Sequence, residues 1–184
     1  MSRKSRQQVV TISGDLGSGK STVARMLARK LGWQYYSTGM AQRQIATELG
    51  LSTIELNQKA LSDKSIDARI DAVFKNPPWG DEPCVVDSRL AFHFLPKSFK
   101  VCLTVNPTVA AQRILHDEVR TGERKYKTLK QAEAACKERR KLEIERFMKN
   151  YGINIEDPNN FDFIIDTSDL SPLKIRNLIL KAIS

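Results

Sequence analysis

The segment GDLGSGKS, residues 14–21, constrains the fold of this chain more than any other feature. It follows VVTIS, residues 9–13, a short β-branched run that is typical of a buried strand. It precedes residues 20–31, where apolar side chains recur at helical spacing until Gly32. A glycine-rich turn between a strand and a helix brings backbone N–H groups together at a helix N-terminus, which favours phosphate binding. The segment therefore predicts a phosphate-binding loop.

The spacing of this loop matches the motif G-x-x-x-x-G-K-[ST]. In that motif Lys20 is expected to reach the β and γ phosphates of a nucleotide, and the Ser21 hydroxyl is expected to bind Mg²⁺. The alternative is a glycine-rich turn that a lysine follows by chance. The strand before the loop and the helix after it favour nucleotide binding.

Strands and helices alternate along the rest of the chain. Further strands are expected at residues 33–36, 84–87, 100–105 and 161–166. Helices are expected at residues 39–49, 63–75 and 128–149, from Pro107 to about Arg120, and from Pro172 onward. A further helix is expected after Ser52, which caps it and forms a capping box with Glu55. This alternation predicts a three-layer α/β fold, in which helices cover both faces of a parallel sheet. The 184 residues suit a single domain.

Composition excludes several classes of protein. No run of 18 apolar residues could span a membrane, and the basic N-terminus MSRKSRQQ lacks the apolar stretch of a signal peptide. The three cysteines form no CxxC pair and the two histidines are isolated, which argues against a zinc site and favours a reducing cytoplasm. The net charge of +9 favours an anionic partner, either a polymer or a small phosphate compound.

Two polar clusters are expected at the carboxyl edge of the sheet, where open α/β folds bind ligands. STGMAQR, residues 37–43, follows the second strand, and VVDSR, residues 85–89, contains the end of the third. Asp87 is expected to serve a metal ion or its waters. Arg43 and Arg89 are expected to bind phosphate oxygens, because guanidinium groups do so bidentately and stay charged.

A third cluster lies in the basic segment of residues 113–149. Arg139, Glu143 and Arg146 follow one another at offsets of four and three residues, which places them on one helix face. Solvated ion pairs are the alternative interpretation of any single arginine here, because exposed pairs contribute little to stability. If the cluster meets the sheet edge, arginines from three parts of the chain converge on one cleft.

This inventory also bears on the acceptor of a phosphoryl group. Kinases that act on a hydroxyl need a carboxylate to orient it and take its proton. The segment YYSTG after the second strand has no acid, although Asp87 could still act as one. A phosphate acceptor is already ionised and needs cations that offset the repulsion between two phosphates. Many arginines and few bases therefore favour a phosphorylated acceptor.

Together the motifs resemble those of the nucleoside monophosphate kinases, and most closely the short, archaeal-type cytidylate kinase-like group. The resemblance covers nearly the whole chain and rests on ISGDLGSGKST, STGMAQR, VVDSRL, RxxxExxR followed by FMKNYGINIED, and FDFIIDTSDLSP. It implies one P-loop kinase domain over residues 1–184, with acceptor-binding helices at about 38–76 and a lid at about 120–146. It also implies a monomeric cytoplasmic enzyme that transfers the γ-phosphoryl group of ATP, with Mg²⁺, to CMP or dCMP.

The resemblance implies a role for each matching position. The residues that would hold the ATP phosphates are Gly14, Gly17, Ser18, Gly19, Lys20, Ser21 and Thr22. Those that would contact the acceptor nucleotide are Thr38, Arg43, Asp87, Arg89 and Glu143. Those that would stabilise the transferring group are Lys20, Arg89, Arg139 and Arg146. Ser21 and Asp87 would bind the metal, and Arg113 would lie near the adenine.

The chain departs from the family pattern in ways that leave the base open. Ser88 and Leu90 replace the glycine and the second aspartate of the family's D-G-R-D stretch, and Asp15 lies where proline is frequent. Another monophosphate or a small hydroxyl compound is therefore an alternative acceptor. A nucleotide-gated nucleic-acid binder is an alternative of another class, although residues 113–149 offer only Tyr126 and Phe147 for stacking.

Overall fold

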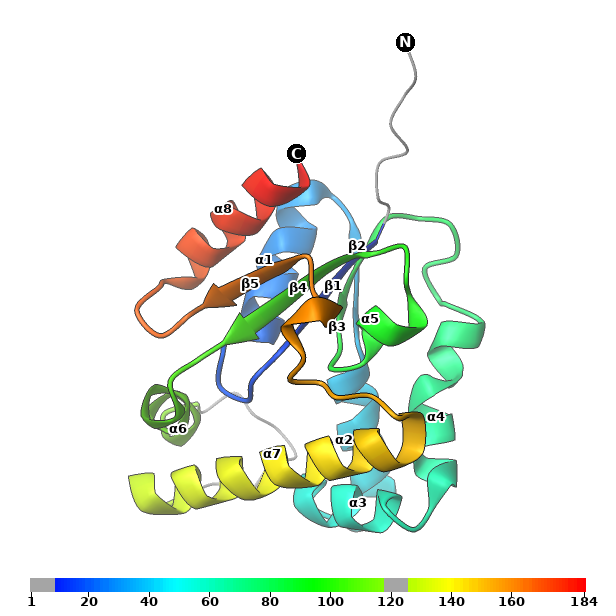
Figure 1. The fold of residues 1–184 in the computed structure, drawn as a ribbon, viewed down its shortest axis with the longest axis vertical. Helices are drawn as coiled ribbons and strands as arrows, with labels where there is room; N and C mark the ends of the chain where they lie inside the picture. Colours follow the sequence, from blue (N-terminus) through cyan, green and yellow to red (C-terminus); the bar gives the residue numbers. More distant parts are fainter. Residues whose placement is uncertain (1–8, 118–125) are drawn as a thin grey trace.

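A computed structural model describes residues 9–117 and 126–184. Five strands form one parallel sheet in the order β2-β3-β1-β4-β5 (Figure 1). Their bounds are Val9–Gly14 for β1, Gln34–Ser37 for β2, Cys84–Asp87 for β3, Phe99–Thr104 for β4 and Phe163–Asp166 for β5. The expected α/β class is thereby confirmed. The order of the strands places β1, and the loop that follows it, at the centre of the sheet.

Helices α1 (Lys20–Leu31) and α8 (Pro172–Ile183) cover one face of the sheet. The main core lies between them and the strands. Its fully buried side chains include Ile12, Leu27, Leu103 and Ile179. This packing holds the start of α1 firmly behind the phosphate loop.

The other face is covered by short or irregular segments. Helix α5 (Ala91–Phe94) directly follows β3, and the 3-10 turn η1 (Pro158–Asn160) precedes β5. A smaller core around Trp79, Val86 and Ala91 lies under this cover. Because α5 begins so close to the end of β3, the three residues between them are held at the sheet edge.

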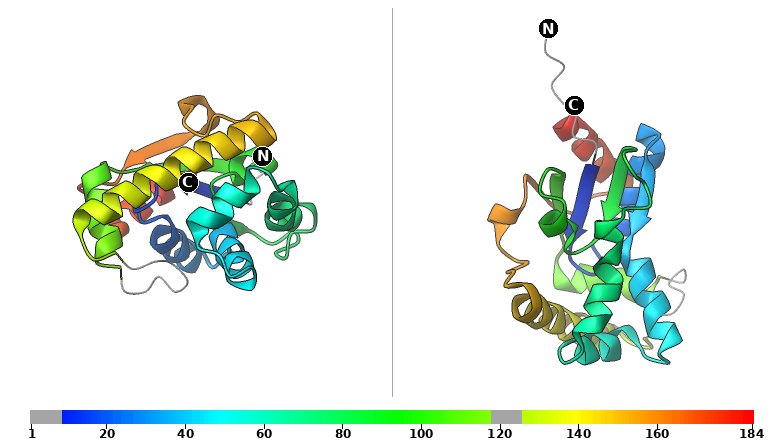
Figure 2. Two further views of the ribbon diagram at one scale, coloured as in Figure 1. Left: turned by 90° about the horizontal axis from the view of Figure 1, so that it is seen from below. Right: turned by 90° about the vertical axis from the view of Figure 1, so that its right-hand side faces the viewer.

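The remaining helices gather at the carboxyl ends of the strands (Figures 1 and 2). They are α2 (Thr38–Glu48), α3 (Thr53–Ala60), α4 (Lys64–Lys75), α6 (Pro107–Leu115) and α7 (Leu129–Tyr151). Helix α7 runs across this end of the molecule and packs against α6 and α3. Within the described residues, none of the helices is both long and apolar enough to cross a membrane.

Most expected elements agree with the structure to within a few residues, including the Ser52–Glu55 capping box. Helix α6 is an exception, because it ends at Leu115 and not near Arg120. Its last buried side chain is Ile114, and the two residues after Leu115 are exposed, so the described residues that follow it add no buried contact that would extend the helix. Residues 118–125, which include the start of the expected lid, lie outside the described part of the chain.

Candidate functional site

The phosphate loop packs tightly against β4 and α6. Gly14 has φ 128°, and a Cβ there would lie 2.0 Å from the carbonyl oxygen of Leu103. Gly17 has φ 79°, and a Cβ there would lie 2.8 Å from the Cα of Ala110. Both positions therefore require glycine, for space and for backbone conformation. The loop is pressed into one shape, with its N–H groups at the N-terminus of α1.

Lys20 is folded back onto this loop. Its Nζ donates a hydrogen bond to the carbonyl oxygen of Asp15 at 2.6 Å, and the side chain is buried. Burial, together with the nearby charge of Arg89, lowers the pKa of Lys20 to about 7. Ser18 donates to the same carbonyl at 2.8 Å and is fully buried, so its hydroxyl is used within the loop. A bound phosphate would give Lys20 the negative partner that the loop alone does not supply.

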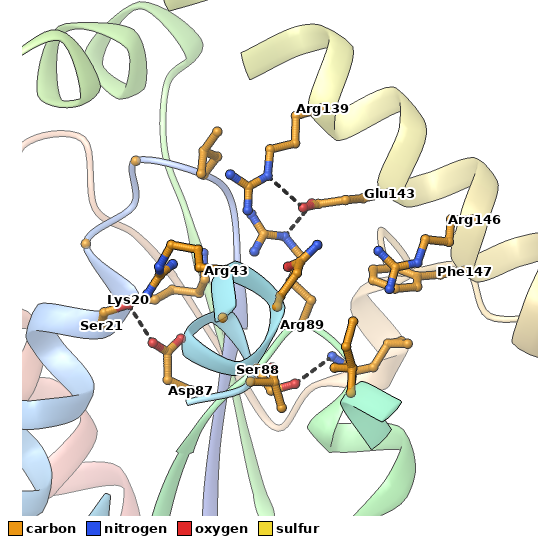
Figure 3. Close-up of a pocket in the computed structure, with 18 of the residues that line it drawn as sticks. Lys20, Ser21, Arg43, Asp87, Ser88, Arg89, Arg139, Glu143, Arg146 and Phe147 are labelled. Atoms are coloured by element: carbon orange, nitrogen blue, oxygen red, sulfur yellow. Dashed lines mark hydrogen bonds and ion pairs between the residues drawn. The ribbon is translucent and has the colours of Figure 1, made fainter. Parts of the chain in front are cut away.

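Asp87 and Ser21 form the second part of the site, where β3 ends beside the start of α1. The Ser21 Oγ donates to the Asp87 Oδ2 at 2.5 Å (Figure 3). The hydroxyls of Tyr35 and Ser37 lie 3.3 Å from the same oxygen. Among the described residues no cluster of three or more metal-binding side chains occurs. Mg²⁺ takes hard oxygen ligands, and nucleotide sites supply one or two from protein and the rest from phosphates and water. A hydroxyl and a carboxylate side by side therefore fit Mg²⁺.

Arg89 is the cationic centre of the site. Its side chain is 16% exposed and forms an ion pair with Glu143 of α7, which also pairs with Arg139 Nε at 3.1 Å (Figure 3). The charges of Arg89 and Arg139 outweigh burial and hold the pKa of Glu143 below its usual range. The Nε of Arg89 forms an ion pair with Glu143 but no hydrogen bond of normal geometry. The buried Nη2 of Arg89 has no hydrogen-bond partner among the described residues. A buried guanidinium nitrogen without an acceptor is suited to an anion that arrives from outside.

One cavity of about 340 Å³ connects these groups. It brings together most of the expected site residues, namely Gly17, Gly19, Lys20, Ser21, Thr22, Thr38, Arg43, Asp87, Arg89, Arg139, Glu143 and Arg146. They come from the phosphate loop, α1, α2, the end of β3 and α7. Gly14, Ser18 and Arg113 do not line this cavity. The expected convergence of arginines from distant parts of the chain is therefore present in the structure.

Arg113 lies behind the phosphate loop. Its guanidinium donates to the carbonyl oxygen of Gly17 at 3.3 Å, and to those of Thr167 and Ser168 at 2.7 and 3.1 Å. These bonds tie the phosphate loop to the loop after β5. Contact of Arg113 with the adenine stays a prediction.

Arg146 was expected to act in a lid, but its guanidinium group is bound to other side chains of the protein. Its Nε donates to Asp67 at 2.9 Å, its Nη1 donates to Asn57 at 2.6 Å, and its Nη2 bonds to Asp67 as well. All three nitrogens thus have partners on α3 and α4, and the residue is 2% exposed. This geometry supports an anchor that joins α7 to α3 and α4. Contact of Arg146 with the transferring phosphate stays a prediction.

A group of polar side chains around Arg146 was not predicted from the sequence. It consists of Asn57, Asp67, Asp71, Asn150 and Tyr151. The only signal in the sequence is the repeat I-D-x-x-I-D at residues 66–71, which places two carboxylates on the apolar face of a helix. Carboxylates are seldom buried without partners, so this pattern could have indicated paired or functional groups.

A phosphate loop that shares one cavity with arginines from distant parts of the chain is the arrangement of a P-loop kinase, which presents one phosphorylated molecule to an acceptor. The family comparison agrees with this class. The chain belongs to the cytidylate kinase-like family, whose model matches residues 9–169. The suspected family is thereby confirmed, and the chain is a phosphotransferase of the nucleoside monophosphate kinase class.

Curated relatives resemble nearly the whole chain. A cytidylate kinase of Natronomonas pharaonis is 35% identical over 178 residues, which cover 96% of this chain and 89% of that protein. A cytidylate kinase of Sulfurisphaera tokodaii is 30% identical over 93% of this chain and 92% of that protein. An S-adenosylmethionine-dependent nucleotide dehydratase of Lacinutrix mariniflava is 32% identical over 94% of this chain, but the match spans only 35% of that longer protein.

Solved structures show the same fold at low sequence identity. An uncharacterized protein from Eubacterium ventriosum has a TM-score of 0.67 at 18% identity and covers 95% of this chain, with 97% of that chain matched. The shikimate kinase of Acinetobacter baumannii has a TM-score of 0.61 at 18% identity, over 95% of this chain and 92% of that chain. These likenesses establish the P-loop kinase fold and say nothing of the acceptor.

Proposed function

We propose that this protein transfers the γ-phosphoryl group of ATP to CMP or dCMP, with Mg²⁺, and releases ADP and CDP or dCDP. The observation that carries the proposal is Arg89, which lines the cavity together with the phosphate loop and whose buried Nη2 has no hydrogen-bond partner among the described residues. A second phosphate would supply the missing acceptor. The two curated relatives named cytidylate kinase, at 30% and 35% identity, favour cytidylate as that acceptor.

In the proposed reaction an oxygen of the acceptor phosphate attacks the γ-phosphorus, and the bond to the bridging oxygen of ADP breaks. An ionised phosphate needs no base, and Asp87 is already surrounded by the three hydroxyls of Ser21, Tyr35 and Ser37. Mg²⁺ held by Ser21 and Asp87 would supply charge neutralisation between the β and γ phosphates. Lys20 and Arg89 offset the remaining charge, and their burial strengthens that effect because little water screens it.

A panel of acceptors tests the proposal. Purified protein with ATP and Mg²⁺ is offered CMP, dCMP, UMP, AMP, GMP, shikimate and gluconate, and ADP release is measured. We expect the highest kcat/KM with CMP or dCMP. Faster turnover of a purine monophosphate or of a hydroxyl compound would replace the proposed acceptor. Loss of ADP release when Mg²⁺ is removed, with recovery on its return, tests the metal.

Arg89→Ala should lower kcat with CMP by about 10³, because an arginine that stabilises the transferring charge is worth at least that much in related kinases. Arg69→Ala is the matched control, since Arg69 lies on α4 in an exposed ion pair with Glu48. Its kcat should stay within about twofold of the wild-type value, because exposed pairs contribute little. Thermal unfolding of both variants shows whether they are folded. A folded Arg89→Ala protein with unchanged kcat would contradict the assignment of Arg89.

A further inference from the structure

One end of the cavity is chemically unlike the end that holds the phosphate loop. Phe147 lies on the side of the cavity away from Lys20 and Ser21 (Figure 3). Ile70 and Leu90 line the same cavity, and all three apolar side chains are buried. This end therefore combines apolar side chains, which suit the faces of a base, with polar groups such as Arg146, whose guanidinium carbon lies 5.4 Å from the Phe147 ring centroid. The end near Lys20 is suited to phosphates.

Asp71 is a polar group that also lines this cavity. It comes from α4, is half-buried, and accepts a hydrogen bond on Oδ2 from the hydroxyl of Tyr151. The ring of Tyr151 lies 6.2 Å from that of Phe147, which places Asp71 at the apolar end. Leu90, which stands where the family pattern has an aspartate, cannot form hydrogen bonds with a base edge.

The two aspartates of α4 differ in how they are used. Asp67 has both carboxylate oxygens engaged, by Arg146 and by Asn150. Asp71 has one oxygen engaged by Tyr151, and its Oδ1 makes no hydrogen bond with any described residue. Of the two carboxylates, only that of Asp71 has an oxygen available to a ligand.

We propose that Asp71 determines which pyrimidine this enzyme accepts, by taking a hydrogen bond from the exocyclic amino group of cytosine on its open oxygen. This inference rests on the proposed function, because it assumes a pyrimidine monophosphate in the cavity. An ionised carboxylate only accepts hydrogen bonds. Uracil has a carbonyl oxygen where cytosine has its amino group, so two acceptors would face each other. The site thus selects cytosine by attraction and rejects uracil by repulsion.

The protonation of Asp71 should set the strength of this selection. Burial raises the pKa of Asp71 to about 6, while the hydrogen bond from Tyr151 opposes the shift. Asp67 on α4 raises this pKa and Arg146 on α7 lowers it, and His93 of α5 contacts the ring of Tyr151. Above pH 6 the carboxylate is ionised and rejects uracil. Below pH 6 its hydroxyl can donate to the uracil carbonyl, so the preference for CMP over UMP should weaken as the pH falls.

Asp71→Asn tests the proposal with little change of shape. The amide has an N–H₂ donor for the uracil carbonyl and an oxygen acceptor for the uracil N3–H. The ratio of kcat/KM for CMP to that for UMP, measured at pH 7.5 in this experiment, should fall by about tenfold or more, which is the usual worth of one discriminating polar contact. Asp81→Asn is the matched control, since Asp81 is exposed and does not line the cavity. That variant should keep the wild-type ratio.

The outcomes separate this inference from the proposed function. A wild-type protein that phosphorylates neither CMP nor dCMP refutes the function and the inference together. A wild-type protein that accepts CMP and UMP equally well, or a folded Asp71→Asn variant that keeps the wild-type ratio, refutes the inference and leaves the kinase assignment intact. If Asp71→Asn does not fold, the wild-type ratio between pH 5.5 and 7.5 decides, because a ratio that does not change with pH also refutes the inference. In a folded Asp71→Asn variant the ratio should not depend on pH. A pH dependence that remained in this variant would come from another titrating group, such as His93.

Discussion

Among single residues, Lys20 is one whose charge we expect to depend on whether a ligand is present. In the structure its ammonium group is buried beside Arg89, and burial lowers its pKa to about 7. A triphosphate beside it would stabilise the charged form and raise the pKa again. Nucleotide binding above pH 7 should therefore take up a proton, and affinity should fall as pH rises, by at most about tenfold per unit.

Titration calorimetry in buffers of different ionisation enthalpy measures this uptake. At pH 8 we expect close to one proton taken up per ATP bound, because most Lys20 is neutral before binding. In Lys20→Arg the uptake should vanish, since arginine stays protonated in both states. Uptake that persists in this variant would assign the proton to another group.

At the scale of elements, the structure joins the helices around the cavity through buried polar contacts. Arg146 of α7 is bound to Asp67 of α4 and Asn57 of α3. The phosphate loop is joined to α7 as well, because Asp15 pairs with Arg140 of α7 at 3.3 Å. The same carboxylate accepts a hydrogen bond from the Val105 N–H, after β4, at 3.2 Å. The carboxylate that replaces the family's proline in this loop thus has a structural partner.

Breaking one side of the Arg146–Asp67 pair should destabilise the fold strongly. Asp67→Ala leaves the Arg146 charge buried without its anion, and we expect a loss of about 3–5 kcal/mol in the free energy of unfolding. The double variant Asp67→Ala with Arg146→Met should lose less than the sum of the two single changes, because it leaves no unpaired charge. Urea unfolding of the wild type, Asp67→Ala, Arg146→Met and the double variant measures this coupling. Strictly additive losses would show that the pair does not join the helices. A loss of activity in an Arg146 variant therefore has to be corrected for its loss of stability.

At the scale of the whole molecule, the proposal requires two phosphorylated ligands to meet in one cavity. A bisubstrate analogue that joins adenosine to cytidine through a chain of phosphates should occupy both ends at once. At a hundred times its Kd it should add about 2.7 kcal/mol of stability, which is a rise in Tm of roughly 5–10 °C for a chain of this size. Arg89→Ala should reduce that rise. A single-stranded RNA that binds tightly at physiological salt, with no effect of the analogue on Tm, would instead favour the nucleic-acid binder that the +9 charge allows.

Most of the fold could be predicted from the sequence because its signals are local. The strand, glycine-rich loop and helix of residues 9–31 are consecutive, so periodicity and glycine spacing define them together. Helix caps such as Ser52 depend on residues three positions apart. The short helix α5 and the early end of α6 were missed, because packing and not local pattern decides them.

Local patterns were enough to predict a phosphate loop on a parallel α/β sheet, since every residue of that motif is a near neighbour of the next. Which side chains line the cavity beside that loop, and which are bound to other residues instead, depends on how distant parts of the chain pack. Arg146 meets Asp67 across 79 positions of the chain, and Tyr151 meets Asp71 across 80. Such contacts arise from how helices pack on one another, so a pattern of neighbouring residues indicates the types of group available and leaves their partners open.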